Sequence, residues 1–561
     1  MNAKACAPSG RNAAWDSIDW KQAEEYVKRL QMRIVKAQKE GRHGKVKSLQ
    51  WLLTHSFYAK ASAVKRVTEN KGKRTPGVDG EIWSTPNAKF NGIGKLERKG
   101  YRPQPLRRTY LKKPSGKMRP LGIPTMRDRA MQTLYKFALD PIAETTANGN
   151  SYGFRVGRCV QDALQECYII LAQKSAPVWI LEGDIKGCFD HISHDWMLEH
   201  IPMDKEILRK FLKCGFVETK TLFPTDEGTP QGGTISPVLC NMVLDGMEKA
   251  IRKAYPLRRK IKGKNYFYGV HFVRYADDFI VTGKTKEILE EEVLPLIKGF
   301  LSERGLTLSE EKTVVTHIDE GFDFLGCNIR KYNGKYLAKP SKKNMKAITA
   351  KIRAVIKRNH AATQENLIGL LNPIIRGWVN SQKYNVSAKA FEQIDFEIWR
   401  ALWRWALRRH KRKGKYWIAK RYFHRVGTRN WTFCTPTKKK TERGNTVYFP
   451  LVYAVDTKIR RFTKIKAAAN PFDYEWQQYF EERETDKMRN DLKGRKTLLR
   501  LWNQQQGLCP VCNEKMTVET GVKIHESKAG GKTVLTLVHP KCHTSIHTLE
   551  SDLEPVLERE L

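Results

Sequence analysis

The chain has 561 residues, of which 40% are hydrophobic and 29% are charged. That much apolar material can bury several cores, so a chain disordered throughout is excluded. The formal net charge of +43 exceeds what solubility requires and indicates a polyanionic partner, nucleic acid first. No run approaches the roughly 18 apolar residues of a membrane span, and the first residues lack a secretory stretch. We therefore expect an unsecreted protein without membrane contact.

The N-terminal third is expected to be helical and then to enter a basic hairpin. Residues 20–68 carry apolar side chains at helical spacing, with lysines and arginines between them. Prolines and glycines punctuate residues 70–80 and predict a loop. In residues 110–124 a Pro-Ser-Gly turn signal separates two apolar flanks, which predicts a hairpin.

The middle of the chain alternates helical patterns with short apolar runs. Residues 178–185 are expected to form a buried strand, and residues 322–329 another. Residues 270–283 are expected to form two strands joined by a turn at 276–278. Strands mixed with helices, without a regular βαβ repeat, favour an α+β domain.

The composition shifts from about residue 340. Residues 341–425 have helical periodicity, and residues 401–425 carry ten Lys or Arg and no acid. Residues 430–500 are basic and are expected to be irregular. The 11 cysteines are an odd number and mostly scattered, which indicates reduced thiols, but three of them cluster after residue 505.

The sharpest chemical signal is Tyr275-Ala276-Asp277-Asp278 at the expected hairpin tip. Two adjacent carboxylates between apolar strands repel each other and lose hydration, and a bound cation compensates for both. Asp184 ends another strand, so three carboxylates at strand ends could hold two Mg²⁺. Such a pair of metals activates an attacking hydroxyl and stabilises a leaving pyrophosphate. For the Asp pair alone, a solvated turn is the simpler interpretation.

The neighbouring motifs favour the metal site. Their order resembles that of reverse transcriptases: Asp184, Gln231-Gly232-Gly233, Tyr275-Ala276-Asp277-Asp278, Lys312 and Phe324-Leu325-Gly326. Over roughly residues 20–561 the chain resembles a group II intron-encoded protein, which joins reverse transcriptase, maturase and an HNH-type domain. Four further segments fit that family: TPGVDG (75–80), GKMRPLGIPT (116–125), TPQGGTISPVLCN (229–241) and LNPIIRGWVNSQKY (371–384).

This resemblance implies a multidomain α+β fold with a right-hand polymerase. The implied domains are an N-terminal helical extension (1–69), fingers and palm (70–338), an α-helical thumb or maturase domain (339–425), a basic DNA-binding region (426–504) and a small zinc-binding HNH-like domain (505–561).

The resemblance also implies a role for each motif residue. The implied roles are Mg²⁺ binding by Asp184, Asp277 and Asp278, a further oxygen from the Ile185 carbonyl, a sugar gate at Phe189, a nucleotide pocket at Gln231 and Gly232, a triphosphate clamp at Lys117 and Arg119, a proton donor at Lys312 and a primer grip at Gly326. Each has a plainer alternative. Phe189 would otherwise be core packing, the clamp a solvated basic turn, and Lys312 an ordinary surface lysine.

The basic helical region is expected to bind RNA. Tryptophans are interleaved with arginines and lysines there. The simpler interpretation of each tryptophan is that it packs in a helical core. Cations on one face would follow a phosphate backbone with salt-sensitive affinity. The candidate contacts are Arg404, Arg408, Arg409, Lys411 and Arg412.

The terminal cluster is expected to hold zinc. Cys509 and Cys512 form one ligand pair, and His539 and Cys542 the other, which fits a tetrahedral Zn²⁺ site. The HNH resemblance implies a second metal near His525, His543 and His547. Where the related family has a His-His pair, this chain has His525-Glu526, so we expect a folded domain that is a poor or inactive nuclease.

The function that the sequence favours is RNA-directed DNA synthesis combined with assistance to splicing. The expected partners are group II intron RNA, a DNA target and deoxynucleotides, and the expected location is the cytoplasm or nucleoid of a bacterium, or an organelle. The oligomeric state stays open, with a dimer as one option. The alternatives are a domesticated enzyme in a role such as phage defence, a splicing chaperone without polymerisation, and an RNA-templated RNA polymerase.

Overall fold

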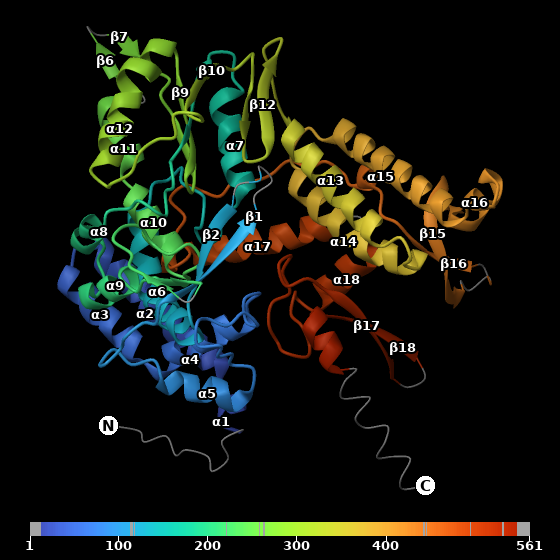
Figure 1. The fold of residues 1–561 in the computed structure, drawn as a ribbon, viewed down its shortest axis with the longest axis horizontal. Helices are drawn as coiled ribbons and strands as arrows, with labels where there is room; N and C mark the ends of the chain where they lie inside the picture. Colours follow the sequence, from blue (N-terminus) through green and yellow to red (C-terminus); the bar gives the residue numbers. More distant parts are fainter. Residues whose placement is uncertain are drawn as a thin grey trace. The chain divides into compact units, whose positions relative to one another are not determined.

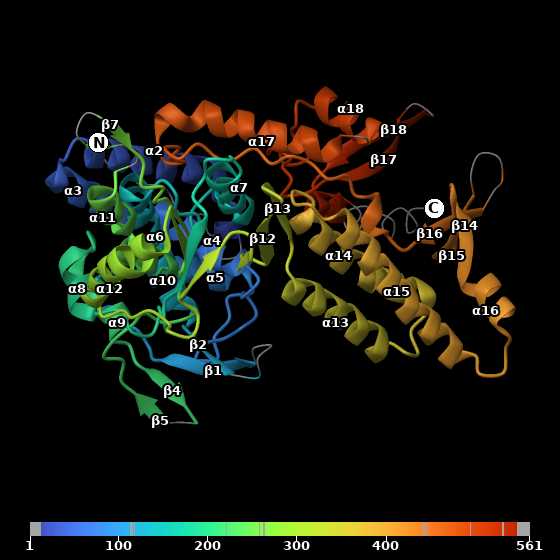
Figure 2. The ribbon, with the colours of Figure 1, turned by 90° about the horizontal axis from the view of Figure 1, so that it is seen from above.

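The computed structural model describes residues 13–112, 116, 118–219, 221–256, 259–261, 264–440, 444, 446–493, 495–529 and 532–546. The chain divides into two compact units, Met1–Ala468 and Ala469–Leu561 (Figures 1 and 2). Among the described residues, no helix combines the length and the apolar character needed to cross a membrane.

Helices form the N-terminal part of the first unit, as expected. Asp19 caps the first long helix by accepting a hydrogen bond from the backbone of Gln22, and Gly41 (φ +68°) separates this helix from the next. The helices pack into one core with the elements that follow. They are α1 (Ala13–Asp16), α2 (Trp20–Lys39), α3 (His43–His55), α4 (Phe57–Glu69) and α5 (Pro86–Gly94).

The basic hairpin is confirmed, and a second hairpin extends its sheet. β1 (Leu106–Lys112) and β2 (Met118–Ile123) pair antiparallel. β1 also pairs in parallel with β4 (Phe216–Glu218), which pairs with β5 (Thr221–Phe223), so the order is β2-β1-β4-β5.

A four-stranded antiparallel sheet carries the carboxylates, in the order β10-β3-β9-β8. The strands expected at 178–185 and 270–283 are confirmed as β3 (Trp179–Asp184), β8 (Phe272–Tyr275) and β9 (Asp278–Gly283), and β10 (Val314–His317) completes the sheet. The elements around it are α6 (Met126–Thr146), α7 (Val160–Leu171), α8 (His194–His200), α9 (Lys205–Leu212), α10 (Ser236–Leu244), α11 (Met247–Ala254), η1 (Ile288–Val293), α12 (Leu294–Ser302), β6 (Arg259–Ile261) and β7 (Lys264–Tyr266).

The single strand expected at 322–329 is wrong. Left-handed backbone at Leu325 (φ +49°) and Gly326 (φ +80°) turns the chain back on itself. Two strands result, β11 (Phe322–Phe324) and β12 (Cys327–Tyr332), and the latter pairs with β13 (Lys335–Pro340).

The helical region after residue 340 is confirmed. Its helices enclose a separate apolar core of Ile, Leu, Trp and Phe side chains, and Figure 2 shows the three longest lying side by side. The helices are α13 (Lys342–Arg358), α14 (Gln364–Gln382), α15 (Ala388–Arg409) and α16 (Lys415–Tyr422).

The expectation that residues 430–500 are irregular is wrong. A three-stranded sheet, β14-β15-β16, covers its first part, because aromatic and β-branched residues such as Trp431, Phe433 and Phe449 favour extended backbone. The strands are β14 (Phe423–Val426), β15 (Arg429–Lys440) and β16 (Thr446–Pro450), followed by η2 (Ala454–Asp456).

The second unit is small and has its own core around Leu492, Trp502, Cys509 and Leu537. Residues 540–546 are helical at the end of its described part. The other elements are η3 (Tyr474–Trp476), α17 (Gln477–Leu492), α18 (Lys496–Gln504), β17 (Lys523–Ala529) and β18 (Lys532–Val538).

Candidate active site

The three carboxylates meet at one end of the four-stranded sheet. In the register of β3 and β9, Asp184 lies directly opposite Asp278. Tyr275 pairs with Asp278 across the turn, and Ala276 (φ +58°) provides its left-handed residue. Asp277 therefore lies on the turn beside the other two acids, as the sequence predicted.

Close packing fixes this turn in place. A Cβ on Gly153 would lie 2.3 Å from the backbone nitrogen of Ala276, so only glycine allows the two segments to approach this closely. From inside, the fully buried Arg274 donates to the carbonyl of Ala276 at 3.2 Å and pairs with Asp245 at 2.7 Å. It also donates to the amide oxygen of Asn241 at 3.2 Å.

The electrostatics of the site favour a divalent cation. Although Asp278 keeps contact with solvent, the surrounding protein raises the pKa of its carboxyl to about 6, first by displacing water and then through the charges of Asp277 and Asp184. Burial likewise raises the pKa of Asp277, and the charge of Asp184 adds to it. Clustered carboxylate oxygens are the ligands that Mg²⁺ prefers, so these residues fit the ion that the sequence predicted.

Lys312 also reaches the site. Its ammonium lies 2.6 Å from a carboxylate oxygen of Asp184, and this contact raises the pKa of the lysine. The side chain remains 63% exposed, so it can move to a substrate. Lys312 therefore lies beside an acid that the sequence predicts to bind metal, and its role as a proton donor stays a prediction.

The predicted nucleotide pocket is organised around Gln231. Arg119 Nε donates to the amide oxygen of Gln231 at 2.9 Å, and the amide nitrogen of Gln231 donates to both carboxylate oxygens of Asp190 at 3.0 and 3.1 Å. Gly232 (φ +122°) lies against the hairpin, where a Cβ would be 2.4 Å from the carbonyl oxygen of Gly122. The backbone here therefore approaches β2 more closely than a residue with a side chain would allow.

The remaining pocket residues lie at the end of β3. Ile185 is buried and bridges to Leu308. Phe189 is only 8% exposed and packs edge-to-face against Phe154, with ring centroids 6.1 Å apart. A gate role for Phe189 would thus act through the small exposed part of a largely buried ring. Lys117, the second clamp residue, lies outside the described residues.

The predicted primer grip is a turn tied to the helical region. The carbonyl of Gly326 accepts hydrogen bonds from the backbone of Ser341 at 3.0 Å and from the amide of Asn344 at 3.1 Å. Trp378 Nε1 in turn donates to Asn344 at 2.8 Å. The loop that would hold the primer end is therefore positioned by α13 and α14.

The five predicted RNA contacts are all exposed, at the end of α15 and just after it: Arg404, Arg408, Arg409, Lys411 and Arg412. Arg409 additionally donates to the carbonyl of Ala362 at 2.6 Å. Of the interleaved tryptophans, Trp378 and Trp405 are buried in the core, as the simpler interpretation predicted, whereas Trp417 is 39% exposed.

The four predicted zinc ligands come together in the second unit. One ligand atom from each of Cys509, Cys512, His539 and Cys542 lies within 4.8 Å of all the others. His539 Nδ1 is 3.3 Å from Cys512 Sγ and 4.0 Å from Cys542 Sγ. Three thiols and one imidazole at this spacing fit a tetrahedral Zn²⁺.

Only two of the three histidines predicted for the second metal lie among the described residues, His525 and His543. The rings of His525 and His543 lie 5.7 Å apart. Glu526 is exposed whereas His525 is buried, because neighbouring residues of a strand face opposite sides. Glu526 therefore lies on the strand face opposite His525. His547 lies outside the described residues.

Three further residues of the site have no role among the sequence predictions. Arg274 was detectable as a charge within an apolar strand, which requires a buried partner. Asp190 stands next to Phe189 and orients Gln231. Gly153 left no signal, because only the fold brings it against the turn.

Three families match successive parts of the chain. They are described as "N-terminal domain of reverse transcriptase" (residues 15–96), "Reverse transcriptase (RNA-dependent DNA polymerase)" (residues 111–329) and "Group II intron, maturase-specific domain" (residues 345–423).

Several curated proteins are similar to part of this chain. Protein YkfC of Escherichia coli is 31% identical over 49% of this chain and 81% of its own length. The group II intron-encoded protein LtrA of Lactococcus lactis is 29% identical over 52% of this chain and 58% of its own. A putative COX1/OXI3 intron 1 protein of Saccharomyces cerevisiae is 28% identical over 58% and 43%. The chain thus spans about half the length of the latter two relatives.

Proposed function

The chain belongs to the group II intron-encoded proteins, as a reverse transcriptase with a maturase domain, and from that premise we propose how its residues act. It extends the 3′ end of a DNA primer with deoxynucleotides, using RNA as the template. The observation that carries this proposal is the meeting of Asp184, Asp277 and Asp278 at one sheet end.

Asp184, Asp277 and Asp278 would hold two Mg²⁺, with the Ile185 carbonyl as a further ligand. When bound, the ions activate the primer hydroxyl and stabilise the charge on the leaving pyrophosphate. The raised pKa of Asp278 without metal reflects first its loss of water and then repulsion from Asp277 and Asp184, and a cation would relieve that repulsion.

The chain's own side chains would position the nucleotide and protonate the leaving pyrophosphate. Arg119, with Lys117, would bind the triphosphate through charge-assisted hydrogen bonds. Gln231, held by Asp190, would line the pocket. Lys312 would give a proton to the leaving pyrophosphate, because its ammonium already lies beside Asp184.

Phe189 would select the sugar by excluding a 2′-hydroxyl. This role favours DNA synthesis over RNA synthesis on the same template. The retained acids likewise favour a polymerase over a splicing chaperone that lacks polymerisation.

Asp277→Asn tests the polymerase. The change keeps the size of the side chain but removes a charge from the metal site, so primer extension on RNA should fall more than about a hundredfold. RNA binding should stay within about twofold. Asp319→Asn, which changes an exposed acid, serves as the matched control. Extension by Asp277→Asn within tenfold of wild type would contradict the metal assignment.

The maturase part would bind group II intron RNA and assist its splicing. The exposed cations at the end of α15 would contact the phosphate backbone, and folded RNA is recognised largely through shape and backbone. The protein would act in the cytoplasm or nucleoid of a bacterium or in an organelle.

The region after the maturase domain would serve intron mobility. Residues 426–504 would bind the DNA target, and residues 505–561 would form a zinc-held, HNH-like domain. The parts before it would be the N-terminal helical extension (1–69), the fingers and palm (70–338) and the thumb or maturase domain (339–425).

A further inference from the structure

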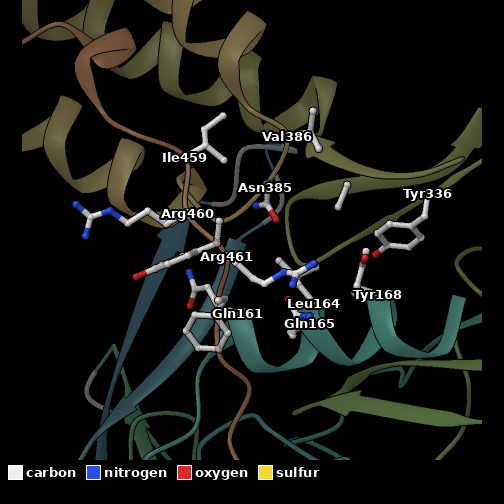
Figure 3. Close-up of a pocket in the computed structure, with 13 residues that line it drawn as sticks. Gln161, Leu164, Gln165, Tyr168, Tyr336, Asn385, Val386, Ile459, Arg460 and Arg461 are labelled. Atoms are coloured by element: carbon white, nitrogen blue, oxygen red, sulfur yellow. The ribbon is translucent and has the colours of Figure 1, made fainter. Parts of the chain in front are cut away.

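A cavity of about 300 Å³ lies in the first unit, apart from the catalytic acids (Figure 3). One wall is helix α7, and another is strand β13. The third is the extended segment 459–462, which follows the maturase helices in sequence but lies here beside α7. This segment is anchored where the backbone nitrogen of Arg460 donates to the carbonyl of Lys383 at 2.9 Å.

Helix α7 turns its acids away from this cavity. The carboxylate of Asp162 accepts a hydrogen bond from the backbone of Ile465 at 2.7 Å, and Glu166 forms an ion pair with Lys464. A different face of α7 lines the cavity, through Gln161, Leu164, Gln165 and Tyr168. Among the described lining residues there is no acid, so the cavity is suited to an anion.

Tyr336 supplies a polar atom that lacks a partner. Its side chain is 9% exposed, and its hydroxyl is shielded from water without a hydrogen bond to any described residue. Burial raises the pKa of this phenol well above its usual value, so the hydroxyl stays protonated and can donate. A buried donor without an acceptor is uncommon, and a ligand oxygen or nitrogen would satisfy it.

Arg461 supplies the positive charge. Figure 3 shows its side chain directed along the cavity above Leu164 and Gln165, whereas Arg460 is directed the other way. Arg461 is exposed and has no ion-pair partner within the described part of the chain. Its guanidinium is therefore available for a bidentate contact with phosphate.

Aromatic rings supply a stacking surface. Tyr168 is 40% exposed and is steadied edge-to-face by Tyr336, with centroids 5.4 Å apart. Tyr384 and Phe462 form a second edge-to-face pair at 5.1 Å on the opposite wall. The cavity is larger and more aromatic than a phosphate group alone requires, and a base stacks well on such rings.

We propose that this cavity binds one nucleotide. Arg461 would hold the phosphate, Tyr168 would stack on the base, and the Tyr336 hydroxyl would donate to an acceptor on the base or sugar. The nucleotide is either free or a single unpaired residue of a bound RNA. The second source rests on the proposed function.

Calorimetric titration of the full chain with AMP, without template or primer, tests the site. AMP should bind, and adenosine or inorganic phosphate alone should bind at least about tenfold more weakly, because each makes half of the contacts. Arg461→Ala should weaken AMP about tenfold and Tyr336→Phe about threefold. Lys458→Ala removes an exposed charge from the same segment outside the lining and should change affinity less than twofold.

Photocrosslinking identifies the source of the nucleotide. If the ligand is a free nucleotide, 8-azido-AMP should label peptides containing Tyr168 or Tyr336. If it is an unpaired residue of RNA, a hairpin RNA carrying one bulged 8-azidoadenosine should label them instead. Either pattern supports the site. The proposal would be overturned if neither probe labelled either peptide. It would also be overturned if wild type and Arg461→Ala were labelled equally. Primer extension on the same preparation tests the polymerase separately, so a failure of one assignment is distinguishable from a failure of the other.

Discussion

At the scale of single residues, the turn that carries Asp277 depends on the absence of a Cβ at Gly153. Gly153 has no Cβ, and this lets the loop before α7 lie directly on the backbone of Ala276. Arg274 and Asp245 hold the same turn from inside the protein. The position of Asp277 is thus set by Gly153, Arg274 and Asp245.

Gly153→Ala should displace this turn. The new Cβ would lie 2.3 Å from the nitrogen of Ala276, so one backbone segment must move, and a displacement near 1 Å costs on the order of a hundredfold in rate. We expect primer extension to fall at least about tenfold with unchanged circular dichroism. Gly149→Ala is the matched control in the same loop, since its Cβ would meet Ala467 at an ordinary 3.4 Å. Equal activities of the two variants would contradict this account of the turn.

Phe189→Ala should relax sugar selection. Removing the ring opens space where a 2′-hydroxyl would lie, so the ratio of kcat/KM for ribonucleotides to that for deoxynucleotides should rise about tenfold or more. Phe154→Ala removes the ring that packs against Phe189 and separates gating from loosened packing. If both variants shift the ratio equally, or neither does, Phe189 is a core residue and not a gate.

At the scale of elements, strong local patterns predicted the structure well. The strand at 178–185 and the paired strands at 270–283 were predictable because apolar residues of strand length flank turn residues. The strand expected at 322–329 failed because its two positive-φ residues, Leu325 and Gly326, leave little mark on hydrophobicity. The β14-β15-β16 sheet was missed because its lysines masked an aromatic, β-branched pattern.

The end of α15 provides the element-scale prediction. Replacing Arg404, Arg408, Arg409, Lys411 and Arg412 by Gln should weaken RNA binding, because fewer counterions are released. The slope of log K against log salt should flatten by about 3.5 to 4.5. The slope is measured by filter binding from low to high salt.

The matched control removes an equal number of exposed lysines that precede the maturase helices in sequence. These are Lys249, Lys253, Lys284, Lys286 and Lys298. It should leave the slope nearly unchanged. A loss of affinity in the α15 variant without a change in slope would show damaged packing instead. Arg409 is the position where such damage would arise, because it also donates to Ala362.

At the scale of the whole molecule, some features could be predicted from the sequence and others could not. The order of the polymerase motifs predicted one site for the acids, Gln231 and Lys312, and the structure brings Lys312 to Asp184. The contact of Gly326 with Asn344, and the cavity beside Tyr336, unite residues distant in sequence. Neither has a local pattern, so only the folded chain reveals them.

The second unit should depend on zinc for its fold. Its core is small, and small domains are commonly held together by a structural metal. Cys512→Ser should lower bound zinc, measured by mass spectrometry, from about one ion per chain to less than about 0.2. Proteolysis should then cut within residues 505–546 while the polymerase unit stays intact. Cys214→Ser is the matched control outside the cluster, and full zinc content in Cys512→Ser would contradict the ligand assignment.

The same unit should be a poor nuclease although it is folded. A general base must activate water, and the exposed Glu526 lies on the strand face opposite His525 and so away from His543. Cleavage of a DNA duplex carrying the insertion site, with Mg²⁺ or Mn²⁺, should therefore stay near background. Glu526→His tests whether the base alone is missing, with Glu519→His as an exposed control in the same unit. Robust cutting by the wild type that disappears in His547→Ala would show that the unit is an active nuclease. If cutting is absent, the first strand of integration must be primed by a DNA end that another process supplies, such as a nascent strand at a replication fork.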